Sequence, residues 1–164
     1  VVAHDAAYSE IGFDGHQPIS FLQLPDAKSV GIEFHSLSKT YRMTGWRIGW
    51  VCGNAAAIAA LARVKSHLDS GIFQPIQWAG VEALDGDQAP LHQAVAAYQT
   101  RRDLLIEGLA KAGWQIPKPI ATFYVWARVP GEASSMAFSF RFRSACRLTH
   151  PETRKREAIR ERRR

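Results

Sequence analysis

Short apolar runs that end in polar residues, followed by long stretches of helical spacing, most constrain the fold of this 164-residue chain. Three runs read as β-strands: residues 1–5, 30–34 and 46–51. Three longer stretches carry apolar residues at helical spacing: about 54–68, 74–84 and 89–112. Strands that alternate with helices indicate an α/β architecture, in which ligands bind beyond the carboxyl ends of the strands. Trp46, Trp50 and Leu105 are expected in the core.

A lysine follows the second predicted strand, in the sequence Ser36-Leu37-Ser38-Lys39, and Arg47 comes eight residues later. Lysine is the side chain that forms an imine with an aldehyde. Hydroxyls and a planar guanidinium bind phosphate well, because they offer several donors in a fixed geometry. Pyridoxal 5'-phosphate (PLP) carries both an aldehyde and a phosphate. The pattern therefore predicts that Lys39 is the Schiff-base lysine of a PLP site. The predicted phosphate ligands are Ser36, Ser38 and Arg47.

The end of the first predicted strand carries complementary groups. Asp5 is its last residue, and Tyr8 follows three positions later. A PLP site needs an anionic partner that keeps the pyridine nitrogen protonated, so that the ring accepts electrons from the substrate's α-carbon. A phenol beside the 3'-oxygen tunes the proton of the imine. We therefore predict that Asp5 and Tyr8 supply these two groups, and that the neighbouring His4 and His35 are packed or hydrogen-bonded rather than catalytic.

Asp-x-x-Tyr, then Ser-x-Ser-Lys, then an arginine eight residues on form a specific combination. With it, residues 1–54 resemble the fold-type-I PLP-dependent aminotransferases of class I/II, and residues 4–13 and 31–41 are most similar to the LL-diaminopimelate aminotransferase branch. The resemblance implies an α/β fold: part of the large PLP-binding domain, with a mostly parallel sheet flanked by helices, and the start of the small α+β C-terminal domain. It also implies an enzyme of lysine biosynthesis that moves an amino group between an amino acid, with LL-diaminopimelate as a candidate, and a 2-oxo acid.

The same resemblance gives each site residue a role. Asp5 would bind the pyridinium nitrogen and Tyr8 the 3'-oxygen. Lys39 would hold the cofactor and then carry the proton. The phosphate ligands would be Ser36 and Arg47, with Ser38 as a secondary contact.

The resemblance also divides the chain. Residues 1–95 would form the second half of the large domain, and residues 96–137 the start of the small domain, whose sheet would begin at residues 121–130. Residues 138–164 depart from the family pattern and are expected to be an atypical tail, most simply a shifted reading frame. The chain is therefore expected to be an interior fragment that lacks the family's N-terminal phosphate contacts and C-terminal carboxylate-binding arginine. An intact relative is expected to be a homodimer.

The net charge of +6 lies entirely in that tail. Residues 138–164 hold ten of the 21 basic residues but only three of the 15 acidic residues, which leaves the rest of the chain at −1. A near-neutral body suits an enzyme of small metabolites, whereas clustered basic residues attract nucleic-acid phosphates and leave nucleic-acid binding as a minor alternative. Two cysteines and the lack of a run of about 18 apolar residues favour a cytoplasmic protein without a membrane segment. The sequence contains no metal-binding motif.

Two further alternatives use the same residues. Ser36 and Lys39 fit the Ser-x-x-Lys pattern of serine acyl-transfer enzymes. That chemistry also wants Ser-Asp-Asn and Lys-Thr-Gly motifs, which the sequence lacks, and a helix opened by the serine, whereas residues 40–45 read as a loop. A PLP-binding but catalytically incomplete fragment would form the lysine adduct without turning over an amino acid.

Overall fold

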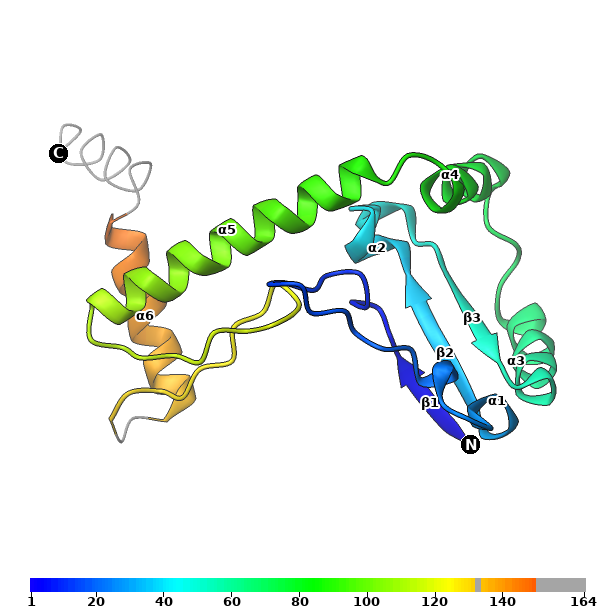
Figure 1. Ribbon diagram of the computed structural model, residues 1–164, viewed down its shortest axis with the longest axis horizontal. Coiled ribbons are helices and arrows are strands. Elements are labelled where there is room, and N and C mark those ends of the chain that lie inside the picture. The colour runs from blue at the N-terminus through cyan, green and yellow to red at the C-terminus, as the bar shows by residue number, and fades with distance from the viewer. Residues whose placement is uncertain (132–133, 150–164) are drawn as a thin grey trace, which may run out of the picture.

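The computed structural model describes residues 1–131 and 134–149, and it has the mixed α/β character that the sequence predicts (Figure 1). The strands are β1 (Val2–Asp5), β2 (Gly31–Ser36) and β3 (Gly49–Gly53). The larger helices are α3 (Ala55–Leu68), α4 (Gln74–Asp85), α5 (Ala89–Lys111) and α6 (Ser135–Thr149). Four single turns complete the described elements: η1 (Phe21–Gln23), α1 (Ala27–Val30), α2 (Leu37–Thr40) and η2 (Thr44–Trp46).

The three strands form one sheet in the order β1-β2-β3. β1 and β2 are parallel, with Asp5 opposite Phe34, whereas β2 and β3 are antiparallel, with Ser36 opposite Gly49. An antiparallel edge strand on an otherwise parallel sheet is common in α/β folds. Because β1 and β2 run in the same direction, their carboxyl ends meet at one edge of the sheet. The polar residues that follow each strand therefore emerge side by side.

α3, α4 and α5 begin and end close to the residues that the sequence predicts. Asn54 caps α3, because its side-chain oxygen accepts a hydrogen bond from the Ala57 amide at 2.9 Å. Gly113 follows α5 with φ of 85°, a left-handed conformation that suits glycine at a helix C-terminus. Figure 1 shows α5 leading away from the sheet toward α6. No described helix is both long and apolar enough to cross a membrane.

The third strand starts later than predicted, at residue 49 rather than 46. Thr44–Trp46 form a 3₁₀ turn, and Arg47 has a left-handed φ of 56°, so the chain becomes extended only after it. The expectation that Trp46 and Trp50 are core residues is wrong, because they are 48% and 40% exposed. Leu105 is also exposed. Apolar spacing identifies a face of an element, but it does not say whether another element covers that face.

The largest fully buried apolar side chains are Ile11 and Phe13 in the loop after β1 and Leu37 on α2. Backbone hydrogen bonds from Thr122 to Ile11 and from Phe13 to Ile120 join this loop to the segment before Tyr124. Several apolar side chains of α3, α4 and the loop between them remain exposed: Val64, Leu68, Phe73, Trp78 and Val81.

The C-terminal third departs most from the sequence-based expectation. Residues 121–130 do not form a strand; within the described residues their one backbone bridge joins Ala121 to Gly12. A β-strand needs a neighbouring strand for its backbone groups, and none of the described strands lies beside this segment. The first part of the Arg-rich tail is helical, as α6, and residues 150–164 lie outside the described residues. The division at residues 95 and 137 stays a prediction.

Candidate active site

Lys39 lies on α2, a single helical turn that begins where β2 ends. Ser36 is both the last residue of the strand and the N-cap of the turn, because its Oγ accepts a hydrogen bond from the Ser38 amide at 3.2 Å. The Tyr41 amide closes the turn by donating to the Leu37 carbonyl at 3.1 Å. Lys39 is half-buried, and Ser38 is buried. This turn therefore places the amine and two hydroxyls together at the carboxyl end of β2.

The helix that Ser36 opens corrects one sequence-based argument. The absence of such a helix counted against the serine acyl-transfer alternative, but residues 37–40 do form one. It spans one turn, after which residues 41–43 leave the helical path and Arg42 has a left-handed φ of 59°. The missing Ser-Asp-Asn and Lys-Thr-Gly motifs remain the evidence against that chemistry.

The Arg47 side chain approaches Ser38 from the opposite end of the loop that joins α2 to β3. Its Nη1 donates to the Thr44 carbonyl at 3.0 Å and lies 3.5 Å from the Ser38 Oγ. The Leu37 amide donates to the Ile48 carbonyl at 3.2 Å, which ties the two sides of the loop together. The left-handed backbone at Arg47 turns the chain between η2 and β3. The guanidinium and the Ser38 hydroxyl thus form one cluster of donors, the kind of site that binds a phosphate.

Asp5 and Tyr8 stand at the neighbouring strand end. The Ala6 amide donates to the Phe34 carbonyl at 2.8 Å, which extends the β1–β2 ladder one residue past Asp5. The exposed Asp5 carboxylate accepts a hydrogen bond from the Ala7 amide at 3.3 Å, so it also serves the turn that follows β1. The Lys39 Nζ lies 5.8 Å from the centre of the Tyr8 ring, within the range of a cation–π contact. The structure therefore brings Lys39 and Tyr8 together from two different strand ends.

A second tyrosine, which sequence analysis did not assign to the site, completes this group. The hydroxyls of Tyr8 and Tyr124 are 3.0 Å apart. This hydrogen bond, then burial, then the negative charges of ionised Tyr124 and of Asp5, raise the pKa of Tyr8 to about 12. At neutral pH the Tyr8 phenol is therefore protonated. No local sequence pattern points to this pair, because residues 121–130 read as a strand of another domain.

A buried carboxylate lies between the two strand ends. Glu33 accepts hydrogen bonds from His4 Nδ1 and His35 Nε2, each at 2.8 Å, and from the Ser20 Oγ and the Phe21 amide. Burial raises the pKa of Glu33, but the hydrogen bonds from His4, Ser20 and the Phe21 backbone, with the charge of His35, lower it below its usual value. His4 and His35 are thus hydrogen-bonded, as predicted, and neither contacts Lys39.

The imidazole of His35 is also stacked on the indole of Trp50, with ring centres 4.7 Å apart and planes 8° from parallel. This contact accounts for the position of Trp50 better than burial in a core does. It adds an aromatic layer between β2 and β3, because His35 and Trp50 are direct cross-strand partners. Glutamate in the middle of an apolar strand with histidine two positions on was the available signal for this network.

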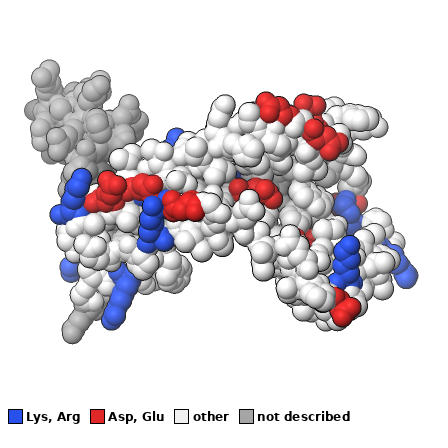
Figure 2. Space-filling view, viewed as in Figure 1, with Lys and Arg blue, Asp and Glu red and all other residues white. Residues whose placement is uncertain are grey.

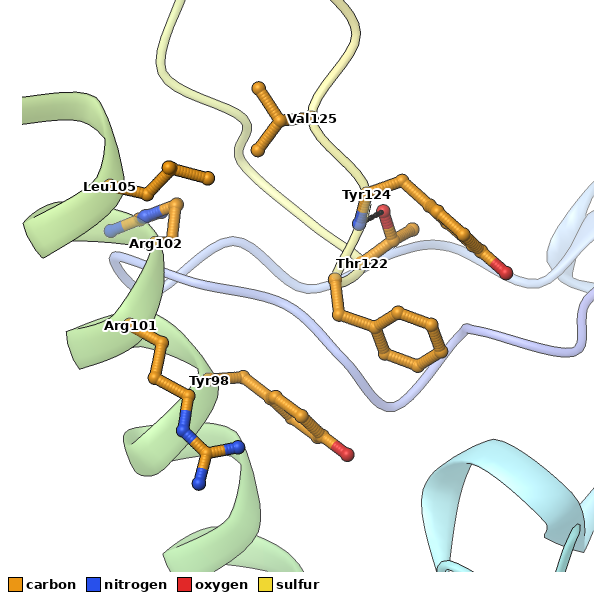
Figure 3. Close-up of a pocket in the computed structure, with 8 residues that line it drawn as sticks. Tyr98, Arg101, Arg102, Leu105, Thr122, Tyr124 and Val125 are labelled. Carbon is orange, nitrogen blue, oxygen red and sulfur yellow. Dashed lines mark hydrogen bonds between the residues drawn. The ribbon is translucent and has the colours of Figure 1, made fainter. Parts of the chain in front are cut away.

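Figure 3 shows a pocket between α5 and the segment that carries Tyr124. Its volume is about 300 Å³, and its lining residues are Tyr98, Arg101, Arg102, Leu105, Thr122, Phe123, Tyr124 and Val125. Phe123 is in ring contact with Tyr8 at 5.5 Å. The pocket therefore adjoins the candidate site, but none of the predicted site residues lines it.

The face of the molecule shown in Figure 2 does not carry a single basic patch. In the view of Figure 2, acidic and basic side chains are interspersed. Among the described residues, several of these charges are paired, as in the Lys65–Asp69 contact on α3. This face gives no support to binding of a nucleic-acid backbone, which requires clustered positive charge. Most of the Arg-rich tail lies outside the described residues.

Comparison with known proteins identifies relatives that carry the same elements. The family described as "Aminotransferase class I and II" matches residues 1–153. LL-diaminopimelate aminotransferase from Moorella thermoacetica is 57% identical over 139 residues, which cover 85% of this chain and 36% of that protein. LL-diaminopimelate aminotransferase 2 from Trichormus variabilis is 47% identical over 151 residues, 92% of this chain and 39% of its own length. The chain thus spans somewhat more than a third of the curated relatives that it matches.

Solved structures agree with this assignment. Substrate-bound BacF from Bacillus subtilis superimposes with a TM-score of 0.81 at 39% identity, over 85% of this chain and 36% of that one. An aminotransferase from Staphylococcus aureus superimposes with a TM-score of 0.79 at 34% identity, over 92% of this chain and 38% of that one. With its strand-end lysine, Asp-x-x-Tyr motif and fold-type-I elements, the chain belongs to the class I and II aminotransferase family.

Proposed function

We propose that this chain contributes the lysine-bearing part of a PLP-dependent aminotransferase, which transfers an amino group between an amino acid and a 2-oxo acid. The observation that carries the proposal is the placement of Lys39. Its amine lies 5.8 Å from the Tyr8 ring and on the same single turn as the buried Ser38, where two parallel strands end. LL-diaminopimelate is the proposed amino-group donor, on the strength of relatives that carry that name.

The donor set fits the cofactor. Arg47, Ser38 and Ser36 offer a guanidinium and two hydroxyls for a phosphate dianion. Asp5 offers a carboxylate for the pyridine nitrogen, and Tyr8 offers a protonated phenol for the 3'-oxygen. Lys39 offers the amine that would hold the aldehyde carbon covalently. When bound, PLP supplies an electron-accepting ring that stabilises negative charge at the α-carbon of an amino acid.

The residues of this chain would then act as follows. Asp5 holds the ring nitrogen in its protonated form, because a carboxylate favours the cationic ring. Tyr8 would donate a hydrogen bond to the 3'-oxygen of the cofactor, since its phenol remains protonated at neutral pH. The free amine of Lys39 would take a proton at its Nζ from the substrate's α-carbon and pass it to the carbon that carries the cofactor's aldehyde group. Arg47 and the two serines keep the phosphate end fixed while this proton moves.

Homodimer formation and a cytoplasmic location belong to the same proposal, by analogy with the family. A catalytically incomplete PLP-binding fragment is the competing proposal, because the chain spans only somewhat more than a third of the length of its relatives. Sedimentation of the purified chain tests the dimer.

The direct test is to add PLP to the full chain, reduce with borohydride and map the pyridoxyl-modified peptide. We expect the modification at Lys39 in the wild-type chain and none at residue 39 in Lys39→Arg, which keeps the charge but forms no imine. Lys65→Arg is the matched control, because Lys65 is an exposed lysine paired with Asp69 on α3. Labelling spread over several lysines, unchanged in Lys39→Arg, would sink the proposal.

Turnover separates the two proposals. LL-diaminopimelate and a 2-oxo acid are supplied together, and formation of the new amino acid is followed. Product formation that Lys39→Arg abolishes supports the aminotransferase, whereas a Lys39 adduct without any product supports the incomplete fragment.

A further inference from the structure

We propose that Tyr124 is a positioning residue for Tyr8: its hydroxyl fixes the direction in which the Tyr8 hydroxyl points toward a bound pyridoxal ring. The inference rests on the proposed function for the role of Tyr8, and it adds a residue from a distant part of the chain to that site. Tyr124 follows Tyr8 by 116 positions, and local sequence patterns do not connect the two.

The contact between the two phenols is a hydrogen bond of ordinary length, with 3.0 Å between the oxygens. The rings meet edge to face, with centres 5.6 Å apart and planes at 74°. Each phenol has one proton to donate. If Tyr124 donates to the Tyr8 oxygen, the Tyr8 proton is free to point at another acceptor, such as the 3'-oxygen. If Tyr8 donates, it can only accept from other groups.

Two backbone hydrogen bonds join the segment that carries Tyr124 to the loop that follows Tyr8. The Phe13 amide donates to the Ile120 carbonyl at 2.9 Å, and the Thr122 amide donates to the Ile11 carbonyl at 2.8 Å. Ile11 and Phe13 are fully buried. Ile11 lies three residues after Tyr8, so these hydrogen bonds hold the two tyrosines in the same packed part of the chain.

Local contacts then restrict the Tyr124 side chain. The Tyr124 amide donates to the Thr122 Oγ1 at 3.2 Å, the contact drawn in Figure 3. Phe123 lies 5.5 Å from the Tyr8 ring and 5.5 Å from the Tyr98 ring, so it packs between the sheet-end loop and α5. The rotation of the segment about its own axis is thereby limited, and Tyr124 faces Tyr8 rather than solvent alone.

The raised pKa of Tyr8 indicates which phenol donates. The hydrogen bond to Tyr124 is the largest cause that raises the pKa of Tyr8 to about 12, as expected when the protonated Tyr8 phenol donates and Tyr124 accepts. A bound 3'-oxygen would take over this donated proton, and Tyr124 would then turn its own proton toward the Tyr8 oxygen. The Lys39 Nζ lies over the Tyr8 ring, 5.8 Å from its centre. Tyr124 is therefore the neighbour whose removal changes the Tyr8 hydroxyl while leaving Lys39 and the ring of Tyr8 in place.

The test is a titration of the full chain labelled with ¹³Cζ-tyrosine and followed by NMR, with the Tyr8 resonance assigned by Tyr8→Phe. In Tyr124→Phe we expect the pKa of Tyr8 to fall from its wild-type value toward about 10, the value of a free tyrosine. Tyr98→Phe is the matched control, because Tyr98 contacts Phe123 but not the Tyr8 hydroxyl; it should leave the Tyr8 titration unchanged. Tyr124 is 59% exposed and keeps its ring in the variant, so the chain should stay folded, which circular dichroism checks.

A Tyr8 titration that is the same in Tyr124→Phe as in the wild-type chain overturns the inference. A second readout uses the cofactor: in chain loaded with PLP at Lys39, the pH midpoint of the absorption band should differ between Tyr124→Phe and Tyr98→Phe. Identical midpoints also count against the positioning role. Failure of the proposed function looks different, because the wild-type chain would then form no Lys39 adduct whatever the tyrosines do.

Discussion

Arg102 of α5 donates to the carboxylate of Asp14, 88 positions away in the sequence, with 2.8 Å between Nη1 and Oδ2. The same guanidinium bonds to Asp103 and to the Pro119 carbonyl, and it lies 4.6 Å from the centre of the Phe13 ring. Its side chain is only 4% exposed. One arginine thus joins α5, the loop after β1 and the segment that leads to Tyr124.

Replacing Arg102 by alanine should destabilise the folded chain by about 1–3 kcal/mol, because it removes a buried side chain that packs on Phe13 and bonds to the Pro119 carbonyl. The ion pairs with the partly exposed Asp14 and Asp103, by contrast, are screened by solvent. Arg101→Ala is the matched control on the same helix: Arg101 is exposed, and its loss should stay within about 0.5 kcal/mol. Urea unfolding of the two variants measures the difference. Equal midpoints would mean that the Arg102 contacts contribute no net stability.

Replacing Glu33 by glutamine should destabilise the chain by about 2 kcal/mol near neutral pH, since hydrogen bonds to a buried charged acceptor are lost. The pKa of Glu33 is lower in the folded chain than in the unfolded chain, where it is about 4.3. Its contribution is therefore fully present above that value and is lost as the pH falls through the folded-state pKa. Urea unfolding at pH 6 and again below pH 4 should show the gap between wild type and Glu33→Gln closing in acid. A constant gap would contradict this.

Replacing Arg47 by asparagine should weaken PLP binding by about 10- to 100-fold, the range expected from loss of a charged hydrogen-bond donor. Asparagine tolerates the left-handed backbone at this position, so the loop should keep its shape. Arg42→Asn is the matched control, because Arg42 is also left-handed and lies outside the donor cluster. Fluorescence titration with PLP compares the two. Equal losses in both variants would rule out a specific phosphate role for Arg47.

Replacing Asp5 by asparagine separates its charge from its turn contact, because the asparagine oxygen can still accept from the Ala7 amide. In a chain that turns over, we expect the rate to fall by at least about 100-fold, as for other lost electrostatic contacts in active sites. Asp87→Asn is the control: Asp87 makes the same kind of contact, with the Ala89 amide at 2.9 Å, far from Lys39 in sequence. Stability should change little in either variant. An unchanged rate in Asp5→Asn would remove Asp5 from the proposed cofactor contacts.

Local patterns were sufficient for the strands, for α3, α4 and α5, and for the family itself. The strand that ends at Asp5, the cap at Asn54 and the stop at Gly113 each depend on a few neighbouring residues, and the structure has all three. The later start of β3 was missed because a left-handed φ at an arginine has no sequence signature. The exposure of Trp50 was missed because alternation does not reveal that its partner is His35.

Contacts between distant segments account for the rest. The hydrogen-bond partners of Tyr124 and Glu33 are distant in the sequence. Tyr124 bonds to Tyr8, and Glu33 bonds to His4 and Ser20. Residues 121–130 match the family's strand pattern, yet no described strand pairs with them. The prediction of a strand there was therefore wrong, because a local pattern does not show whether a partner strand is present. The roles of Lys39, Asp5, Tyr8, Ser36, Ser38 and Arg47 stay predictions.

The pairing of His4 with Glu33 also belongs to the register that places the end of β1 beside the end of β2. A slip of one residue between β1 and β2 would shift Asp5 by about 3.3 Å along the sheet and turn its side chain to the opposite face. Such a slip would also pull His4 away from a carboxylate that is only 1% exposed to solvent. The buried glutamate therefore helps to set the register of β1 against β2, and with it the position of Asp5 relative to the turn that carries Lys39.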